Sequence, residues 1–331
     1  MNGRKVAVYY AWDRSMEVSA PLAVLENRFP ALFESRRMLY PRFSELSDPE
    51  RFNQGIEGFL DQILKKNFVE FAEFASRETG HRTLEIERGG HDDRHTPLGN
   101  EFLRSIDTLI VISFDSIRTA QQASVEEIAG VAEFLERTDN LVFVCPHHSI
   151  GHADEASEAA LRDLQLQEFL HHGDKTIPPQ QRFGGFARSL LSGLGVPVEN
   201  LFGLRPAAQA DGSPAPIKIE RDLDHLGILE GVTTFNAHPH LPHLRRVGDG
   251  GGKLDVLARQ RIDTAAPPHS FVQGGRTDFD ALLQARPGVF AGSLLVGDAT
   301  LWSSTAGGVD NLRRLWKNVV GRPSRPVIGF S

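Results

Sequence analysis

The only cysteine of the chain lies two residues before a pair of adjacent histidines, a combination that can support nucleophilic catalysis. Cys145, His147 and His148 occur in the stretch LVFVCPHHSIGHAD, which also contains His152 and Asp154. A thiol attacks as its thiolate, and a neighbouring imidazole can take up the thiol proton near pH 7. Cys145 is therefore a candidate nucleophile, although most free cysteines are small buried residues with no role in chemistry.

A second group of histidines, His238, His240 and His243, lies in the stretch AHPHLPH. In an extended segment His238 and His240 point to the same side. Imidazole is a ligand that zinc and iron accept, so His147, His238, His240 and His243 form a candidate site for a divalent metal, zinc or iron. The alternative is that polar loops collect histidines without binding anything, and neither zinc-finger nor H-E-x-x-H spacing occurs.

Three of the histidines are candidates for proton transfer, and Asp298 is a candidate for ligand binding. His147, His148 and His238 are the residues we expect to act as general acids or bases. Asp298 follows an apolar run in VGDATLW, and ligands of open α/β sheets bind beyond the carboxyl ends of strands. An aspartate in this position also caps helices or forms turns, and we favour this structural role.

Apolar runs predict the strands that would position these residues. The clearest runs span residues 5–10, 106–114, 141–145 and 293–296. Between the second and third, residues 124–137 carry Ser124 as a helix cap and an apolar stripe, which predicts a helix and thus a βαβ unit. We expect a pocket where the loops after 106–114 and 141–145 meet, with 236–243 closing over it.

Other segments complete the predicted secondary structure. Residues 19–80 show mostly helical periodicity, with Gly80 placed to stop the last helix. Residues 82–88 alternate apolar with polar side chains and suit a strand near a sheet edge. The C-terminal stretch GGVDNLRRLWKNVV predicts a helix with one apolar side.

Composition narrows the classes of function. The 331 residues carry a net charge of −7 and a hydrophobic fraction of 40%, values typical of a globular protein with a sizeable core. Basic residues form no cluster, so we expect no nucleic-acid partner. No stretch reaches the roughly 20 apolar residues of a membrane span. One cysteine makes no internal disulfide and fits a reducing cytoplasm, and the sequence leaves a homo-oligomer open.

The order of these elements, with Cys145 ending the strand 141–145 and with the closing stretches GSLLVGDATLWSS and GGVDNLRRLWKNVV, resembles the class I glutamine amidotransferase-like superfamily, nearest to its ThuA-like branches. The resemblance implies a flavodoxin-like α/β fold, a mostly parallel sheet with helices on both faces and long insertions. It implies one domain over 1–331, with a helical insertion around 19–80 and an irregular one around 203–275. Cys145 would stand at the nucleophile position, and AHPH is similar to the family's His-Pro-Glu.

Departures from the family pattern change the expected chemistry. Val144 and Pro146 flank Cys145 where the family has glycine-rich turns, and proline lacks the backbone N–H that would stabilise an oxyanion. His240 replaces the family's acidic residue. We therefore expect a hydrolase or lyase of a small polar molecule, using Cys145 or a metal-bound water, with no nucleotide cofactor. The alternative is a non-catalytic protein of the same fold that binds a small molecule or serves in an assembly.

Overall fold

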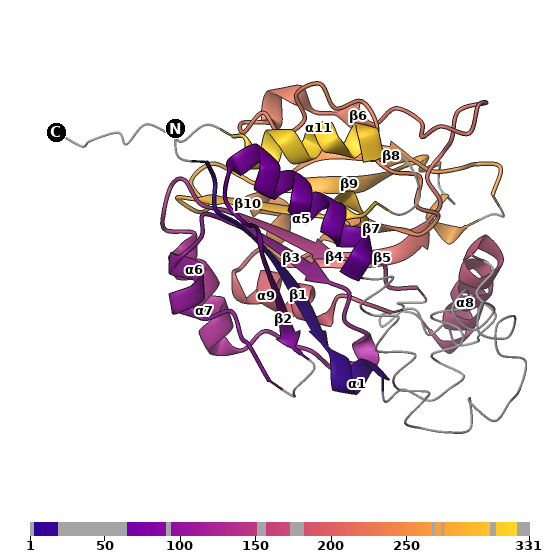
Figure 1. Ribbon diagram of the computed structural model, residues 1–331. Helices are drawn as coiled ribbons and strands as arrows, with labels where there is room; N and C mark the ends of the chain where they lie inside the picture. Colours follow the sequence, from indigo (N-terminus) through magenta and orange to yellow (C-terminus); the bar gives the residue numbers. More distant parts are fainter. Residues whose placement is uncertain are drawn as a thin grey trace, which may run out of the picture.

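The strands form around apolar and β-branched runs and assemble into one large sheet, which is seen in the computed structural model of Figure 1. The structure describes residues 3–18, 65–90, 94–150, 157–172, 182–266, 269–272, 275–304 and 309–322. Most of the helical insertion predicted around 19–80 lies outside these ranges, and its described part begins at residue 65.

The main sheet contains eight strands and is parallel over its first five. In order across the sheet they are β2 (Leu84–Gly89), β1 (Val6–Asp13), β3 (Thr108–Ser113), β4 (Leu141–Pro146), β10 (Ser293–Gly297), β9 (Asp278–Ala285), β8 (Leu254–Arg261) and β6 (Lys218–Ile219). Neighbours from β2 to β10 are parallel, and those from β10 to β6 are antiparallel. Both β3 and β4 are buried throughout, as parallel strands covered on both faces should be.

Helices cover both faces of the sheet (Figure 1). One face packs against α5 (Lys66–Thr79) and α11 (Val309–Val320). The other packs against α6 (Asn100–Arg104), α7 (Val125–Phe134) and α9 (Gly185–Gly193). The remaining elements are α1 (Arg14–Val18), α8 (Glu158–His172), α10 (Gly250–Lys253), the two-stranded sheet of β5 (Val198–Leu204) and β7 (Leu241–Arg246), and the 3₁₀ turns η3 (Ile117–Thr119), η4 (Arg221–Leu223), η5 (Ser270–Val272) and η6 (Ala299–Trp302).

Side chains of β4 alternate between the two faces, as the period of a strand requires. Leu141, Phe143 and Cys145 join the core beneath α5 and α11, whereas Val142 and Val144 join the core beneath α7 and α9. The thiol of Cys145 therefore belongs to the interior of the protein. Residues after Pro146 emerge at the carboxyl edge of the sheet.

The α/β class and most of the predicted elements are confirmed. Strands form within or over all four apolar runs, α7 begins after Ser124 with a complete capping box, and α5 ends at Gly80, whose φ of 72° suits glycine. The edge position of β2 is also confirmed. Strands β5, β7 and β9 were not predicted. The insertion expected around 203–275 contains β6, β7 and β8, of which the stretches IKIERD and LDVLARQRID predict β6 and β8 by their strand-like pattern.

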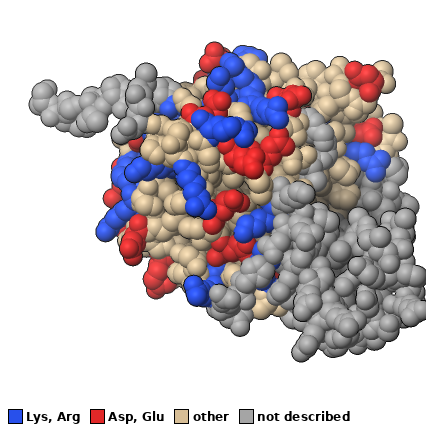
Figure 2. Space-filling model, viewed as in Figure 1, with Lys and Arg blue, Asp and Glu red and all other residues tan. Residues whose placement is uncertain are grey.

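Charges of both signs are interspersed on the face shown in Figure 2. One of the ion pairs joins the two helices above the sheet, since Arg313 on α11 lies 2.8 Å from Glu70 on α5. This mixed distribution matches the scattered basic residues of the sequence. Within the described ranges, no helix combines the length and the apolar character that a membrane crossing requires.

Candidate functional site

Four histidine rings meet at the carboxyl edge of the sheet, and we call them the histidine cluster: His147, His148, His238 and His240. Ring centroids lie 4.0 Å apart for His147 and His148, 5.2 Å for His147 and His238, and 5.5 Å for His148 and His240. The rings of His238 and His240 are 5.6 Å apart. His147 and His148 of the first histidine group therefore lie beside His238 and His240 of the second, at the edge where we expected the segment 236–243 to close over a pocket.

Aromatic and amide side chains hold the buried end of the histidine cluster in place. The ring of Phe114, which follows β3 directly, stacks on His147 at 4.3 Å with an interplanar angle of 19°. Phe183 lies 5.3 Å from the ring of His148, and its backbone N–H donates to the His148 carbonyl at 3.1 Å. The buried Asn200 donates its amide to the carbonyls of His147 and Phe183. These contacts leave the His147 ring little freedom to turn.

A buried pair between His147 and Asp298 is the main polar contact of the site. His147 Nδ1 lies 2.9 Å from Asp298 Oδ2, and the two side chains are only 3% and 6% exposed. Both residues reach this point because β4 and β10 are parallel neighbours, with Val144 opposite Val296. The strands end side by side, and the residues that follow them meet beyond the sheet.

Asp298 is ionised in this environment. Burial alone would raise the pKa of its carboxyl, but attraction and a hydrogen bond from His147, hydrogen bonding from Thr300 and the charge of His238 hold that pKa below its ordinary value. An ionised carboxylate only accepts hydrogen bonds, so Nδ1 of His147 must be the donor. When the ring is neutral, its lone pair is therefore on Nε2, as a general base requires.

The segment before β7 joins the cluster to the surface. Asn236, which is fully buried, donates to the carbonyl of Thr300 at 2.7 Å and accepts from the backbone N–H of His238 at 3.3 Å. His147 and His148 are 2% and 1% exposed, whereas His238 and His240 are half-buried. The cluster thus extends from the interior towards solvent.

Cys145 does not share this environment, and its position argues against the predicted role as a nucleophile. Its side chain is fully buried, and Trp302 Nε1–H donates to its Sγ at 3.0 Å. Burial raises the thiol pKa well above its ordinary value, the Trp302 hydrogen bond lowers it less, and the nearby Asp298 charge raises it further. A thiol of this kind stays protonated at neutral pH and packs as a small apolar group.

His243 also lies in another environment. It is part of β7, its ring packs on Phe271 at 5.0 Å, and its Nδ1 accepts the backbone N–H of Asp280 at 3.2 Å. Burial lowers the pKa of this imidazole to about 4, so His243 is neutral at neutral pH. These contacts fix His243 between strands, away from the role expected for it as a metal ligand.

The predicted metal site finds no support among the described residues, where no three histidine, cysteine or acidic side chains are placed to hold an ion. The nitrogens have other contacts: Nδ1 of His147 faces Asp298, and Nδ1 of His238 lies 3.2 Å from the backbone nitrogen of His240. His152 and Asp154, which we named beside the first histidines, lie outside the described ranges.

The pairing of Asp298 with His147 is the feature that sequence reasoning missed. Asp298 does cap η6, as expected, because its Oδ1 accepts the backbone N–H of Thr300 at 2.9 Å. Its second oxygen is then left to face His147. The only signal in the sequence was an aspartate directly after a buried run, at the edge where ligands of such sheets bind.

Comparisons with known proteins give little guidance. No family model matches the chain, and the search of curated proteins found no match. Among solved structures the chain is similar to the exo-beta-1,4-mannosidase Op5Man5 from Opitutaceae bacterium strain TAV5, with a TM-score of 0.35 and 9% sequence identity. The similarity covers 98% of this chain and 37% of the mannosidase chain. A likeness at this TM-score says nothing about what this chain does.

Proposed function

We propose that the chain is an acid–base enzyme of the class I glutamine amidotransferase-like type, a hydrolase or lyase that acts on a small polar substrate without a glutaminase site. The observation that carries the proposal is the buried His147–Asp298 pair at 2.9 Å, surrounded by the other rings of the histidine cluster. A carboxylate that orients an imidazole and stabilises its protonated form is a recurring arrangement for proton transfer in enzymes.

The strand order supports the family assignment. Counted along the chain, the parallel strands β2, β1, β3, β4 and β10 have the order 2-1-3-4-5, which is the order of flavodoxin-like sheets. In such sheets ligands bind beyond the carboxyl ends of the strands, near the point where the order reverses. That point lies between β1 and β3, and Phe114, directly after β3, stacks on His147.

In the proposed mechanism His147 is the general base. Nε2 takes a proton from water, in a hydrolase, or from the substrate, in a lyase, and Asp298 stabilises the resulting imidazolium. His238, whose ring lies 5.2 Å from that of His147 and is half-buried, passes the proton between this base and solvent. Cys145 takes no part, because its protonated thiol faces the core.

A non-catalytic role for the same fold is the second candidate. Aromatic packing favours it, since Phe114 and Phe183 surround His147 and His148, and both imidazoles are almost fully excluded from solvent. In that case the cluster would hold three loops together beside a small-molecule site or a partner, and no proton would be transferred.

A panel of small generic substrates tests the two candidates. The panel contains esters, lactones, amides and phosphate monoesters of low molecular mass. We expect the wild-type protein to turn over at least one class, and His147→Gln to lose about 10²–10⁴-fold in kcat/KM on it. The exposed His225→Gln is the matched control, and both His225→Gln and Cys145→Ala should keep wild-type kinetics.

Three outcomes would contradict the proposal or its mechanism. The first is a folded His147→Gln protein, verified by circular dichroism, that keeps wild-type turnover. The second is a wild-type protein that is inert on every class of the panel, which would favour the non-catalytic role. A Cys145→Ala protein that loses turnover while folded would return the nucleophile to Cys145.

A further inference from the structure

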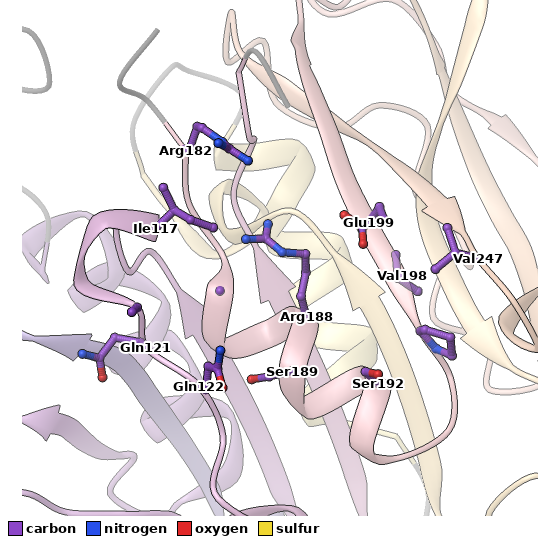
Figure 3. A pocket seen from close by; sticks show the side chains of 13 residues that line it. Ile117, Gln121, Gln122, Arg182, Arg188, Ser189, Ser192, Val198, Glu199 and Val247 are labelled. Carbon is purple, nitrogen blue, oxygen red and sulfur yellow. The ribbon is translucent and has the colours of Figure 1, made fainter. Parts of the chain in front are cut away.

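A cavity of about 550 Å³, lined by polar and apolar side chains, lies beside the histidine cluster but does not include it (Figure 3). It opens between the loop after β3, the helix α9 and the start of β5. Arg182 and Gly185, on either side of Phe183 along the chain, line the cavity. The ring of Phe183 itself packs against His147 and His148. Phe183 therefore stands between the cavity and the cluster.

Three charged side chains from different segments surround this cavity. Figure 3 shows Arg182, Arg188 and Glu199 directed towards the same space, with Arg188 rising from α9 and Glu199 reaching in from β5. Arg188 is held in place because its Nη1 donates to the Phe183 carbonyl at 3.0 Å and to Asn200 Oδ1 at 2.6 Å. A guanidinium that is already positioned loses little freedom when a ligand binds.

The chemistry of the lining selects one class of ligand. Two guanidinium groups match a carboxylate in charge and in planar geometry. Glu199 opposes a second negative charge and favours an ammonium group on the same molecule. Ile117 and Val247 add apolar surface for a short side chain, and the volume is within the range of small-molecule sites.

We propose that this cavity binds a small zwitterion of the amino-acid type, with its carboxylate on Arg182 and Arg188 and its ammonium group on Glu199. The site is additional to the proposed catalytic one and needs no turnover. The two share Asn200, which bonds both Arg188 and the His147 carbonyl. Binding at Arg188 therefore acts on a residue that also positions the histidine cluster.

Titration calorimetry with two matched probes tests the proposal. L-norleucine and hexanoate have the same carbon skeleton and carboxylate, and differ in the ammonium group alone. We expect the wild-type protein to bind norleucine with a Kd of about 1 mM or tighter, and hexanoate at least about tenfold more weakly. Glu199→Gln should remove most of this difference, and Arg188→Gln should weaken both probes by at least about tenfold.

Two further variants keep the test decisive. Ser192 is exposed on α9 and lines the cavity, so Ser192→Trp should fill the cavity without disturbing the core and abolish binding of both probes. Arg104→Gln changes an exposed arginine outside the cavity and should leave both affinities unchanged. If Arg188→Gln does not fold, Ser192→Trp gives the answer alone.

Three results would overturn the proposal. One is the absence of norleucine binding to the wild-type protein at about 10 mM. Another is equal affinity for the two probes, which would deny the role of Glu199. The last is binding that survives in the Ser192→Trp protein, which would place the ligand elsewhere. Because binding is measured without a reaction, these results are independent of whether the histidine cluster is catalytic.

Discussion

Two buried pairs, each of a basic and an acidic side chain, stand at opposite sides of the parallel strands, and only one of them has a basic partner that can give up its proton. Arg88 on β2 lies 3.0 Å from Glu127 on α7, and His147 after β4 lies 2.9 Å from Asp298 after β10. The four side chains are all less than 10% exposed. Distance and burial therefore do not distinguish the two pairs.

The difference lies in the cation and in its surroundings. The Arg88 guanidinium stays charged at every pH that proteins tolerate, and the Glu127 carboxylate also accepts the backbone N–H groups of Leu98 and Ser124. This pair ties β2 to the start of α7. The imidazole of His147 can gain or lose a proton, and further imidazoles surround it. The permanent charge of Arg88 suits a structural role, whereas an imidazole that can gain and lose a proton suits acid–base catalysis.

The largest effect is expected from removing Arg88, which tests whether the Arg88–Glu127 pair is structural. Arg88→Met should leave Glu127 as an unpaired buried charge and lower the free energy of unfolding by about 3–5 kcal/mol, measured by urea denaturation. The control is Arg104→Met, because Arg104 forms an exposed pair with Glu133 and should cost less than about 1 kcal/mol. Equal losses in the two variants would show that the buried pair is not structural.

Asp115 shows what a buried carboxylate does among neutral donors. It accepts from the Ser113 hydroxyl and the Phe186 N–H, and burial, aided by the charge of Glu17, outweighs these bonds and raises its pKa to about 6. A raised carboxyl pKa favours the folded state at low pH. That contribution is complete below the unfolded pKa near 4 and is lost as pH rises through 6.

The stability of wild type relative to Asp115→Asn should therefore fall by about 2 kcal/mol between pH 4 and pH 7, measured by urea denaturation across that range. The exposed Asp222→Asn protein provides the control and should track the wild type. A constant difference between wild type and Asp115→Asn across this range would mean that Asp115 is ionised throughout.

Removing His147 should make Asp298 behave like Asp115. In His147→Gln, burial acts on Asp298 without the attraction of an imidazolium, so the pKa of the carboxyl should rise above its wild-type value, as ¹³C NMR of labelled aspartate can measure. In wild type the lowered pKa stabilises the fold above the ordinary pKa near 4, and this stabilisation is lost as pH falls through the lowered value.

At pH 7 the same substitution should lower the free energy of unfolding by about 2 kcal/mol, since Asp298 loses a buried hydrogen bond. The exposed His225→Gln protein is again the control, with no change expected in either measurement. An unchanged Asp298 titration in His147→Gln would show that Thr300, and not His147, keeps the carboxylate ionised.

Cys145 offers the smallest effect and sharpens the contrast with His147 two residues later. Cys145→Ala removes one sulfur atom from the core and the hydrogen-bond acceptor of Trp302. The free energy of unfolding should therefore fall by only about 1 kcal/mol. In the native protein the thiol should resist a thiol reagent at pH 8, and react fully in urea. Fast native labelling would place the thiol outside the core.

The parallel half of the fold was predictable because its signals are local. Runs such as 106–114 and 141–145 are apolar throughout, and the cap at Ser124 is complete within four residues. β9 carries the sequence DFDALLQA, in which aspartate and alanine have weak strand preference. Its conformation is fixed by pairing with β8 and β10, which no local pattern can reveal.

The sequence predicted where the candidate site lies, but only some of the residues that form it. The sequence placed His147 at the carboxyl edge of the sheet and expected the segment 236–243 to close over it, but it left open whether His147 and His238 meet, because no local pattern shows where a segment outside the main sheet packs. The direction of Cys145 did not, because a run in which every residue is apolar has no alternation to show which face each side chain takes. Asp298 was expected either to cap a turn or to face a ligand. In the structure its Oδ1 caps η6 by accepting the Thr300 N–H, and its Oδ2 faces His147.

The placement of β10 between β4 and β9 has a consequence for how the protein is made. A ribosome delivers β1 to β4 long before Ser293, so the edge of β4 that will pair with β10 stays open while all the residues between these two strands are made. Open apolar edges recruit other chains. A chain cut short before residue 293 should therefore aggregate rather than persist as a folded protein, and the nascent protein should depend on chaperones until β10 has been made.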